Sequence, residues 1–206
     1  MNVSRAPHPT GLTSDLADSD RRISNRHCTV YRIAAVEREG DAGFWRVRNI
    51  SDNGMMLAAS VEVTPGERLQ IALSDTARLT GEVVWAESGR CGVAFDTPIN
   101  AAELLKQLAA EQKASSYRAP RLAVRSHATI VTDEGSREVD VVNLSQQGAG
   151  LAHEGELPVG TKLELILEGG IRRRGIVRWS RKGQTGVWLT APLEQADLES
   201  IRRFED

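Results

Sequence analysis

Two pairs of arginines, each pair spaced four residues apart, occur in the 206-residue chain, and this spacing suits the binding of an anion. Residues four apart lie on the same side of either a helix or an extended strand, so each pair can converge on one ligand. A guanidinium binds phosphate through two parallel hydrogen bonds, and it pairs in the same way with guanine O6 and N7. The pairs are Arg22 with Arg26 and Arg121 with Arg125, and Arg21 and Arg118 are near enough in sequence to join them.

A polar motif, Asn-x-Ser-x-x-Gly, follows each arginine pair. Its Asn and Ser are two residues apart and therefore share one face of a strand. Amide and hydroxyl groups accept hydrogen bonds from guanine N1–H and N2–H or donate to a phosphate oxygen, and the glycine suits a turn or a close approach of backbone to ligand. The alternative interpretation is a turn that merely ends a strand. The two copies are Asn49, Ser51 and Gly54, and Asn143, Ser145 and Gly148.

The two polar motifs belong to an internal repeat. The motifs lie 94 residues apart, and the same offset relates Gly81 to Gly175 and Trp85 to Trp179. The arginine pairs match at an offset of 99 instead. We therefore predict a five-residue length difference in a hairpin turn near 37–44, because turns vary in length most easily.

The repeat predicts two domains, 21–113 and 114–206, after an N-terminal segment, 1–20, whose composition is typical of disorder. Apolar residues alternate along 69–73 and 163–167, and turn residues punctuate the chain about every 8–12 residues. This pattern predicts mainly β structure, with some six short strands per domain in an antiparallel barrel or sandwich. The stretch 101–113 lacks Gly and Pro and predicts a helix that caps the first domain; 193–203 occupies the same place after the second.

Composition argues against several function classes. The formal net charge is −2, the pI is about 6.1 and aromatic residues make up 4% of the chain, whereas nucleic-acid-binding domains usually carry a basic excess and stacking aromatics. We therefore do not expect nucleic acid as a partner, although Arg172–Arg174 with Arg178 offer a basic strip that keeps this alternative open. The histidines show no metal-ligand spacing, so we expect neither a metal site nor an enzyme.

Four further side chains have apolar surroundings in the sequence. Cys28 and Cys91 are expected to be buried free thiols, and Trp85 and Trp179 are expected to pack in the core or at a barrel end rather than against a ligand. No apolar run is long enough to cross a bilayer, and the first twenty residues lack the apolar core of a signal peptide. We therefore expect a cytoplasmic protein without membrane insertion.

Taken together, the arginine pair followed by Asn-x-Ser-x-x-Gly resembles the two-part signature of the PilZ family, and the resemblance covers nearly everything after residue 20. It implies six-stranded β-barrels, each followed by a C-terminal helix, that bind cyclic di-GMP without another cofactor and signal to a protein partner; a homodimer is left open. It further implies that Arg22 and Arg26 grip the ligand while Asn49, Ser51 and Gly54 read a guanine, and that Arg121, Arg125, Asn143, Ser145 and Gly148 do the same in the second domain.

The resemblance also suggests how a signal would arise. We call the residues that carry Arg22 and Arg26 in the first domain, and Arg121 and Arg125 in the second, the arginine segments. Closing of the arginine segment over the ligand is expected to reorient the two domains about the stretch 101–113. The second arginine pair follows Pro120 where the first follows Arg21, so unequal sites are expected. The alternative within this family is an adaptor that needs no ligand, but such domains typically lose the arginines or the Ser motif.

Overall fold

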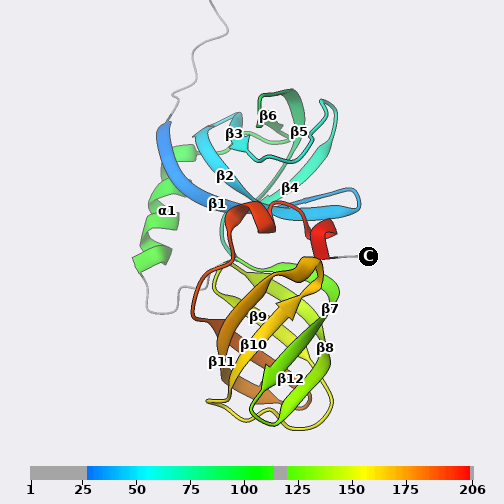
Figure 1. Ribbon diagram of the computed structural model, residues 1–206. Helices are drawn as coiled ribbons and strands as arrows, with labels where there is room; N and C mark the ends of the chain where they lie inside the picture. The colour runs from blue at the N-terminus through cyan, green and yellow to red at the C-terminus, as the bar shows by residue number, and fades with distance from the viewer. Residues whose placement is uncertain (1–26, 114–119, 205–206) are drawn as a thin grey trace, which may run out of the picture.

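The chain forms two closed, six-stranded antiparallel barrels, as expected from the sequence (Figure 1). The computed structural model describes residues 27–113 and 120–204, with only the backbone described for 27–31. The strand order is β1-β2-β3-β6-β5-β4 in the first barrel and β7-β8-β9-β12-β11-β10 in the second. The first barrel comprises β1 (His27–Arg38), β2 (Asp41–Ser51), β3 (Gly54–Ala58), β4 (Arg68–Ala72), β5 (Arg78–Glu87) and β6 (Arg90–Phe95). The second comprises β7 (Leu122–Thr132), β8 (Gly135–Ser145), β9 (Gly148–Ala152), β10 (Lys162–Leu167), β11 (Arg172–Arg181) and β12 (Gln184–Leu189).

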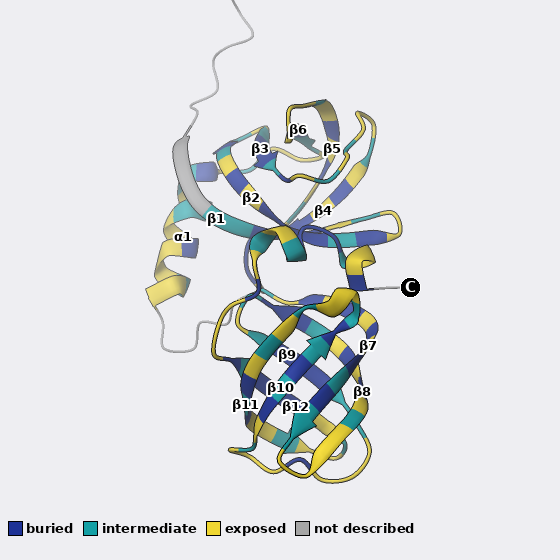
Figure 2. Cartoon of the chain, viewed as in Figure 1, coloured by how far each residue is buried: buried dark blue, intermediate teal, exposed yellow. Residues whose placement is uncertain are grey.

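Each barrel encloses its own apolar core, because alternate residues of every strand point inward. Figure 2 shows this alternation as bands of buried and exposed residues along the strands. Leu57, Leu69 and Ile71 are among the fully buried side chains of the first barrel, and Leu151 and Leu165 lie at the centre of the second. The period-two patterns in 69–73 and 163–167 therefore correspond to β4 and β10.

The predicted length difference between the two hairpin turns is wrong. Arg38 pairs with Asp41 across the first turn and Thr132 with Gly135 across the second, so both hairpins have two-residue turns at equivalent places in the repeat. The structure leaves a difference of one residue rather than five, and it lies upstream of the turns: β1 advances four residues from Cys28 to Arg32 against two on β2, whereas β7 advances three from Ala123 to Ser126 against two on β8.

This register also changes which arginines correspond. His27 pairs with Ile50, and Leu122 pairs with Leu144, which is the repeat counterpart of Ile50. The residue directly before the first strand is Arg26 in one repeat and Arg121 in the other. Arg121 is therefore the counterpart of Arg26, whereas the sequence match had paired it with Arg22.

The predicted helix after the first barrel is confirmed as α1 (Ala101–Lys113). Asn100 precedes it, and its Oδ1 accepts a hydrogen bond of 3.0 Å from the Glu103 amide, which is the geometry of an N-cap. Leu108 is buried and Leu104 and Leu105 are partly buried against the first core, so the helix covers this barrel. The Asp52 side chain also accepts a 3.0 Å hydrogen bond from the Ala101 amide, which joins the helix to the turn of the first polar motif.

The second barrel is not followed by a matching α-helix, which corrects that part of the prediction. Two short 3₁₀ helices form instead, η2 (Gln195–Leu198) and η3 (Ile201–Phe204), after a third, η1 (Glu168–Gly170), that lies between β10 and β11. Figure 1 shows this C-terminal stretch lying between the two barrels. We call residues 195–204 the clasp. Several groups of the clasp bond to the first barrel, more than a hundred residues away in sequence, instead of continuing a regular helix.

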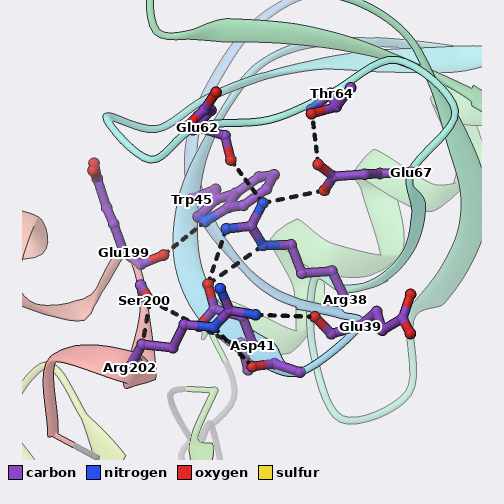
Figure 3. Close-up of polar contacts among 12 residues, drawn as sticks. Arg38, Glu39, Asp41, Trp45, Glu62, Thr64, Glu67, Glu199, Ser200 and Arg202 are labelled. Carbon is purple, nitrogen blue, oxygen red and sulfur yellow. Dashed lines mark hydrogen bonds and ion pairs between the residues drawn. The ribbon is translucent and has the colours of Figure 1, made fainter.

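The clasp connects the barrels through hydrogen bonds that are buried or partly buried (Figure 3). The Glu199 carbonyl oxygen accepts a bond of 3.0 Å from Trp45 Nε1, and Glu199 Oε2 accepts one of 2.6 Å from the Ser60 amide. Ser200 Oγ donates to Asp41 Oδ1 over 2.8 Å. Phe44 of the first barrel is buried within the core of the second, so apolar packing accompanies these bonds.

Arg38 supports the same interface from the first barrel. Its guanidinium lies 3.0 Å from Asp41 Oδ2 and 3.1 Å from Glu67 Oε2, and it stacks on Trp45 with its central carbon 5.6 Å from the ring centroid (Figure 3). Burial alone would lower the pKa of Arg38, but the hydrogen bonds that it donates to both carboxylates, together with their negative charge, outweigh it and raise the pKa above its usual value. Arg38 thus stays charged and holds Asp41 in place to receive Ser200.

Candidate ligand-binding face

Both polar motifs form the same two-residue hairpin. Ser51 pairs with Gly54 and Ser145 with Gly148, which ends one strand and begins the next. Each serine hydroxyl donates to the glycine carbonyl oxygen, over 3.1 Å in the first barrel and 3.2 Å in the second. The hydroxyl oxygen keeps its lone pairs, so it can still accept a hydrogen bond from a ligand.

Arg121 and Asn143 meet on the outer face of the second barrel. Arg121 Nη1 donates to Asn143 Oδ1 over 3.2 Å, and the Asn143 carboxamide lies directly over Gly150 of the adjacent strand. A Cβ on Gly150 would come within 2.5 Å of Asn143 Nδ2, so a side chain there would displace the amide from this position. The arginine segment and the polar motif, which are separate in sequence, are therefore neighbours in this barrel.

The remaining predicted residues divide into two groups. Arg125 is exposed on β7, on the same side of the strand as Arg121 and within the irregular stretch that follows Ala123. Asn49 lies at the matching place on β2, where it pairs with Met56. Four predicted residues lie outside the described part of the chain: Arg21, Arg22, Arg26 and Arg118.

The prediction that the repeated tryptophans pack in the core is wrong. Trp85 and Trp179 are 41% and 37% exposed, and each lies on the outer surface of its barrel. Strict alternation from the buried Val83 would turn Trp85 inward, but the register of β5 shifts between these two residues, and β11 shifts in the same way before Trp179. A bulge of one residue reverses every later side chain, which is why periodicity alone failed here.

Each exposed indole lies flat on a glycine of the neighbouring strand. A Cβ on Gly92 would come within 1.9 Å of Trp85 Nε1, and one on Gly186 within 1.9 Å of Trp179 Nε1. The sequence did carry a signal for this arrangement, since both the Trp and the Gly recur at the repeat offset. The signal became interpretable only with the strand pairing.

These residues form one row across four adjacent strands. In the second barrel, Asn143 pairs with Gly150, Gly150 with Gly186 and Gly186 with Trp179. The two glycines in the middle of this row carry no side chains, so the Asn143 amide lies over Gly150 and the Trp179 indole lies over Gly186. The corresponding row in the first barrel is Asn49, Met56, Gly92 and Trp85.

A groove of about 1340 Å³ lies elsewhere on the first barrel and is a weaker candidate. Its wall includes Arg38 and Arg68, whose guanidinium groups are paired with carboxylates, and Arg202, which donates to the carbonyl oxygens of Glu39 and Gly40. Paired cations of this kind have little capacity left for an anionic ligand. The outer-face rows, which bear the repeated motifs, are therefore the better candidate.

Other expectations concern groups outside this face. Cys91 is buried and free as expected, and burial raises the pKa of its thiol to about 11; the side chain of Cys28 lies outside the described atoms. Within residues 27–113 and 120–204 no cluster of three or more metal-binding side chains occurs. Among the helices described, none has the length and apolar character to cross a bilayer.

The basic strip on β11 is partly neutralised by neighbouring acids. Arg172 lies 3.6 Å from Glu164, and Arg173 lies 3.8 Å from Asp197. Arg178 instead stacks on the ring of Trp188. The strip is therefore less cationic than its sequence suggests.

The family model of the PilZ domain matches the chain twice, over residues 20–111 and 112–205. The chain belongs to the PilZ family. It carries two PilZ domains in tandem, and each match contains one complete barrel. No curated protein matches the chain significantly in sequence.

Three solved structures are among those similar to the chain. The PlzA protein of Borreliella burgdorferi in complex with c-di-GMP is 14% identical with a TM-score of 0.40, covering 90% of this chain and 95% of that one. The Bacillus subtilis inhibitor of motility MotI is 12% identical with a TM-score of 0.34, covering 83% and 94%. YcgR of Escherichia coli in complex with c-di-GMP is 11% identical with a TM-score of 0.30, covering 80% and 76%.

Proposed function

We propose that the protein is a receptor for cyclic di-GMP, rather than an enzyme, and that it passes the signal to a partner protein. The chain belongs to the PilZ family, and the resemblance to this family implies cyclic di-GMP as the ligand. The outer face of each barrel supplies groups that match this ligand, which carries two anionic phosphates and two guanine bases. The protein in this proposal contributes binding and geometry and no chemical step.

The observation that carries the proposal is the contact between Arg121 and Asn143, with Nη1 and Oδ1 3.2 Å apart. It unites the guanidinium segment with the polar motif, as a single binding site requires. Arg121 stands two residues before Ala123, which pairs with Asn143. In the first repeat, Arg26 stands two residues before Cys28, which pairs with Asn49.

Each group on this face has a partner in the ligand. A guanidinium takes a phosphate or the O6–N7 edge of guanine through two hydrogen bonds. The amide of Asn143 and the hydroxyl of Ser145 accept from guanine N–H groups. The indoles of Trp85 and Trp179 are exposed flat surfaces on which a purine stacks, an interaction worth about 1–3 kcal/mol per base.

Any change in the arrangement of the two barrels must overcome the hydrogen bonds between the clasp and the first barrel. A reorientation of the barrels about α1 requires the loss of the clasp bonds from Glu199 to Trp45 and Ser60. We therefore propose that ligand binding changes the position of the arginine segments first. Any change between the barrels will be visible by small-angle scattering, and identical curves with and without ligand would exclude it.

Calorimetric titration of the full chain with cyclic di-GMP tests the receptor assignment. Arg26→Ala and Arg121→Ala should each weaken binding at one barrel about tenfold or more, because each removes a charge-assisted hydrogen bond to the ligand. Arg90→Ala is the matched control, since Arg90 is exposed on β6 away from both motifs and should leave binding unchanged. Absence of heat with the wild-type protein would instead favour the ligand-independent adaptor.

A further inference from the structure

The second barrel carries a guanidinium and an indole that the first barrel lacks, directly beside its polar motif. Trp188 pairs with Gly148, the glycine of the motif, and on its other side with Ile176. The Arg178 guanidinium lies over this indole, with its central carbon 5.3 Å from the ring centroid. Arg178 is the bulge residue of β11, so its side chain points outward next to Trp179.

The stacking on Trp188 orders the Arg178 guanidinium before any ligand binds. Stacking on an indole holds a guanidinium flat and restricts its rotamers, so less entropy is lost when it binds a ligand. Among the described residues, no carboxylate lies within ion-pairing distance of Arg178, in contrast to Arg172 and Arg173 on the same strand. Its five N–H donors therefore remain available to an anion or to a guanine edge.

The first barrel has different residues at the positions that correspond to Arg178 and Trp188. The counterparts of Arg178 and Trp188 are Val84 and Ala94, and Ala94 pairs with the motif residue Gly54. The third counterpart, at Ile176, is Glu82, which also pairs with Ala94. The first barrel thus presents an acid and small apolar groups where the second presents a stacked cation.

In the arginine segments it is the first repeat that carries a guanidinium which the second repeat lacks. Because Arg121 corresponds to Arg26, the second repeat has Tyr117 at the position where the first has Arg22. The second repeat therefore lacks one guanidinium of the pair at equivalent positions. Among the residues that the structure describes, Arg178 is a cation beside Gly148 whose counterpart in the first repeat, Val84, carries no charge.

We propose that Arg178, held on Trp188, is a ligand-binding residue of the second barrel and supplies there the guanidinium that Arg22 supplies in the first. This inference rests on the proposed receptor function and extends it. The two barrels would then bind the same cyclic dinucleotide with cations from different strands: the segment before β1 in one and the bulge of β11 in the other. A difference in affinity and in sensitivity to mutation follows.

The test is calorimetric titration of the full chain with cyclic di-GMP in an Arg26→Ala background, in which the second barrel dominates binding. Arg178→Val, which installs the first-barrel residue, should weaken the remaining affinity about tenfold or more. Trp188→Ala should weaken it less, because the cation stays but loses its support. Arg178→Lys should recover only part of the loss, since lysine keeps the charge without the planar fork.

Arg174→Val is the matched control, because it removes the same charge from an exposed position of the same strand. The inference is overturned if Arg178→Val binds as tightly as its background, or if Arg174→Val weakens binding equally. It is also overturned if Arg26→Ala alone abolishes all binding, although the receptor function would then stand. Only a wild-type chain that binds no cyclic di-GMP removes the receptor function itself.

Discussion

Replacing Gly43 by alanine should break the contact between the two barrels. Gly43 lies on β2 against the clasp, and an ideal Cβ there would be 2.0 Å from the carbonyl oxygen of Glu199 and 2.4 Å from its carbonyl carbon. The obstacle is backbone rather than the end of a flexible side chain. Either β2 or the clasp must therefore move by about 1 Å or more to restore an acceptable contact.

The magnitude follows from what such a movement disrupts. Forcing an extra methyl group into a packed site costs about 1–3 kcal/mol. The Glu199 carbonyl also loses its hydrogen bond from Trp45, and the Ser60 amide loses its bond to the Glu199 carboxylate, at about 1 kcal/mol each. We expect the free energy of unfolding to fall by about 3–5 kcal/mol in total.

Urea denaturation followed by circular dichroism measures this loss, and hydrogen exchange locates it at the Ser60 amide, which should lose protection. Trp45→Phe removes a bond to the same carbonyl, so its effect and that of Gly43→Ala should be less than additive. Arg48→Ala, at an exposed position of the same strand, should change stability by less than about 0.5 kcal/mol. A Gly43→Ala protein of wild-type stability with a protected Ser60 amide would refute the reasoning.

Two further predictions concern buried and stacked groups. Gly186→Ala should displace the Trp179 indole, because the new methyl group would overlap Nε1. The indole N–H resonance of Trp179 should therefore move, and the affinity of the second barrel for cyclic di-GMP should fall. An unmoved resonance would contradict the stacked geometry. In a Cys28→Ser protein, Cys91 should react with a thiol reagent at pH 8 far more slowly in the native than in the unfolded state, since burial raises its pKa from 9.0 to about 11. The pKa of Cys91 is higher in the folded than in the unfolded state, so the contribution of its neutral thiol to stability is complete below about pH 9 and is lost as the pH rises through about 11. Unfolding curves that do not shift over this pH range would contradict the raised pKa.

Much of the fold could be predicted from short-range patterns. The alternation along 69–73 and 163–167, the helical spacing of the leucines in 101–113 and the two Ser-x-x-Gly turns each report on a few neighbouring residues, and each gave the observed element. The prediction failed for the stretch after the second barrel. Its groups are satisfied by Trp45, Ser60 and Asp41, more than a hundred residues away in sequence, and no local pattern contains them.

The candidate site divides in the same way. The sequence by itself determined that a polar motif and an arginine segment occur twice, because this depends only on residue type and position along the chain. Only the tertiary structure decided that Arg121 matches Arg26, that Trp85 and Trp179 point outward and that Arg178 stacks beside Gly148. The physical reason is the β-bulge: one extra residue in a strand shifts the register and reverses the side-chain face, and its position is fixed by pairing across the barrel rather than by the strand's own sequence.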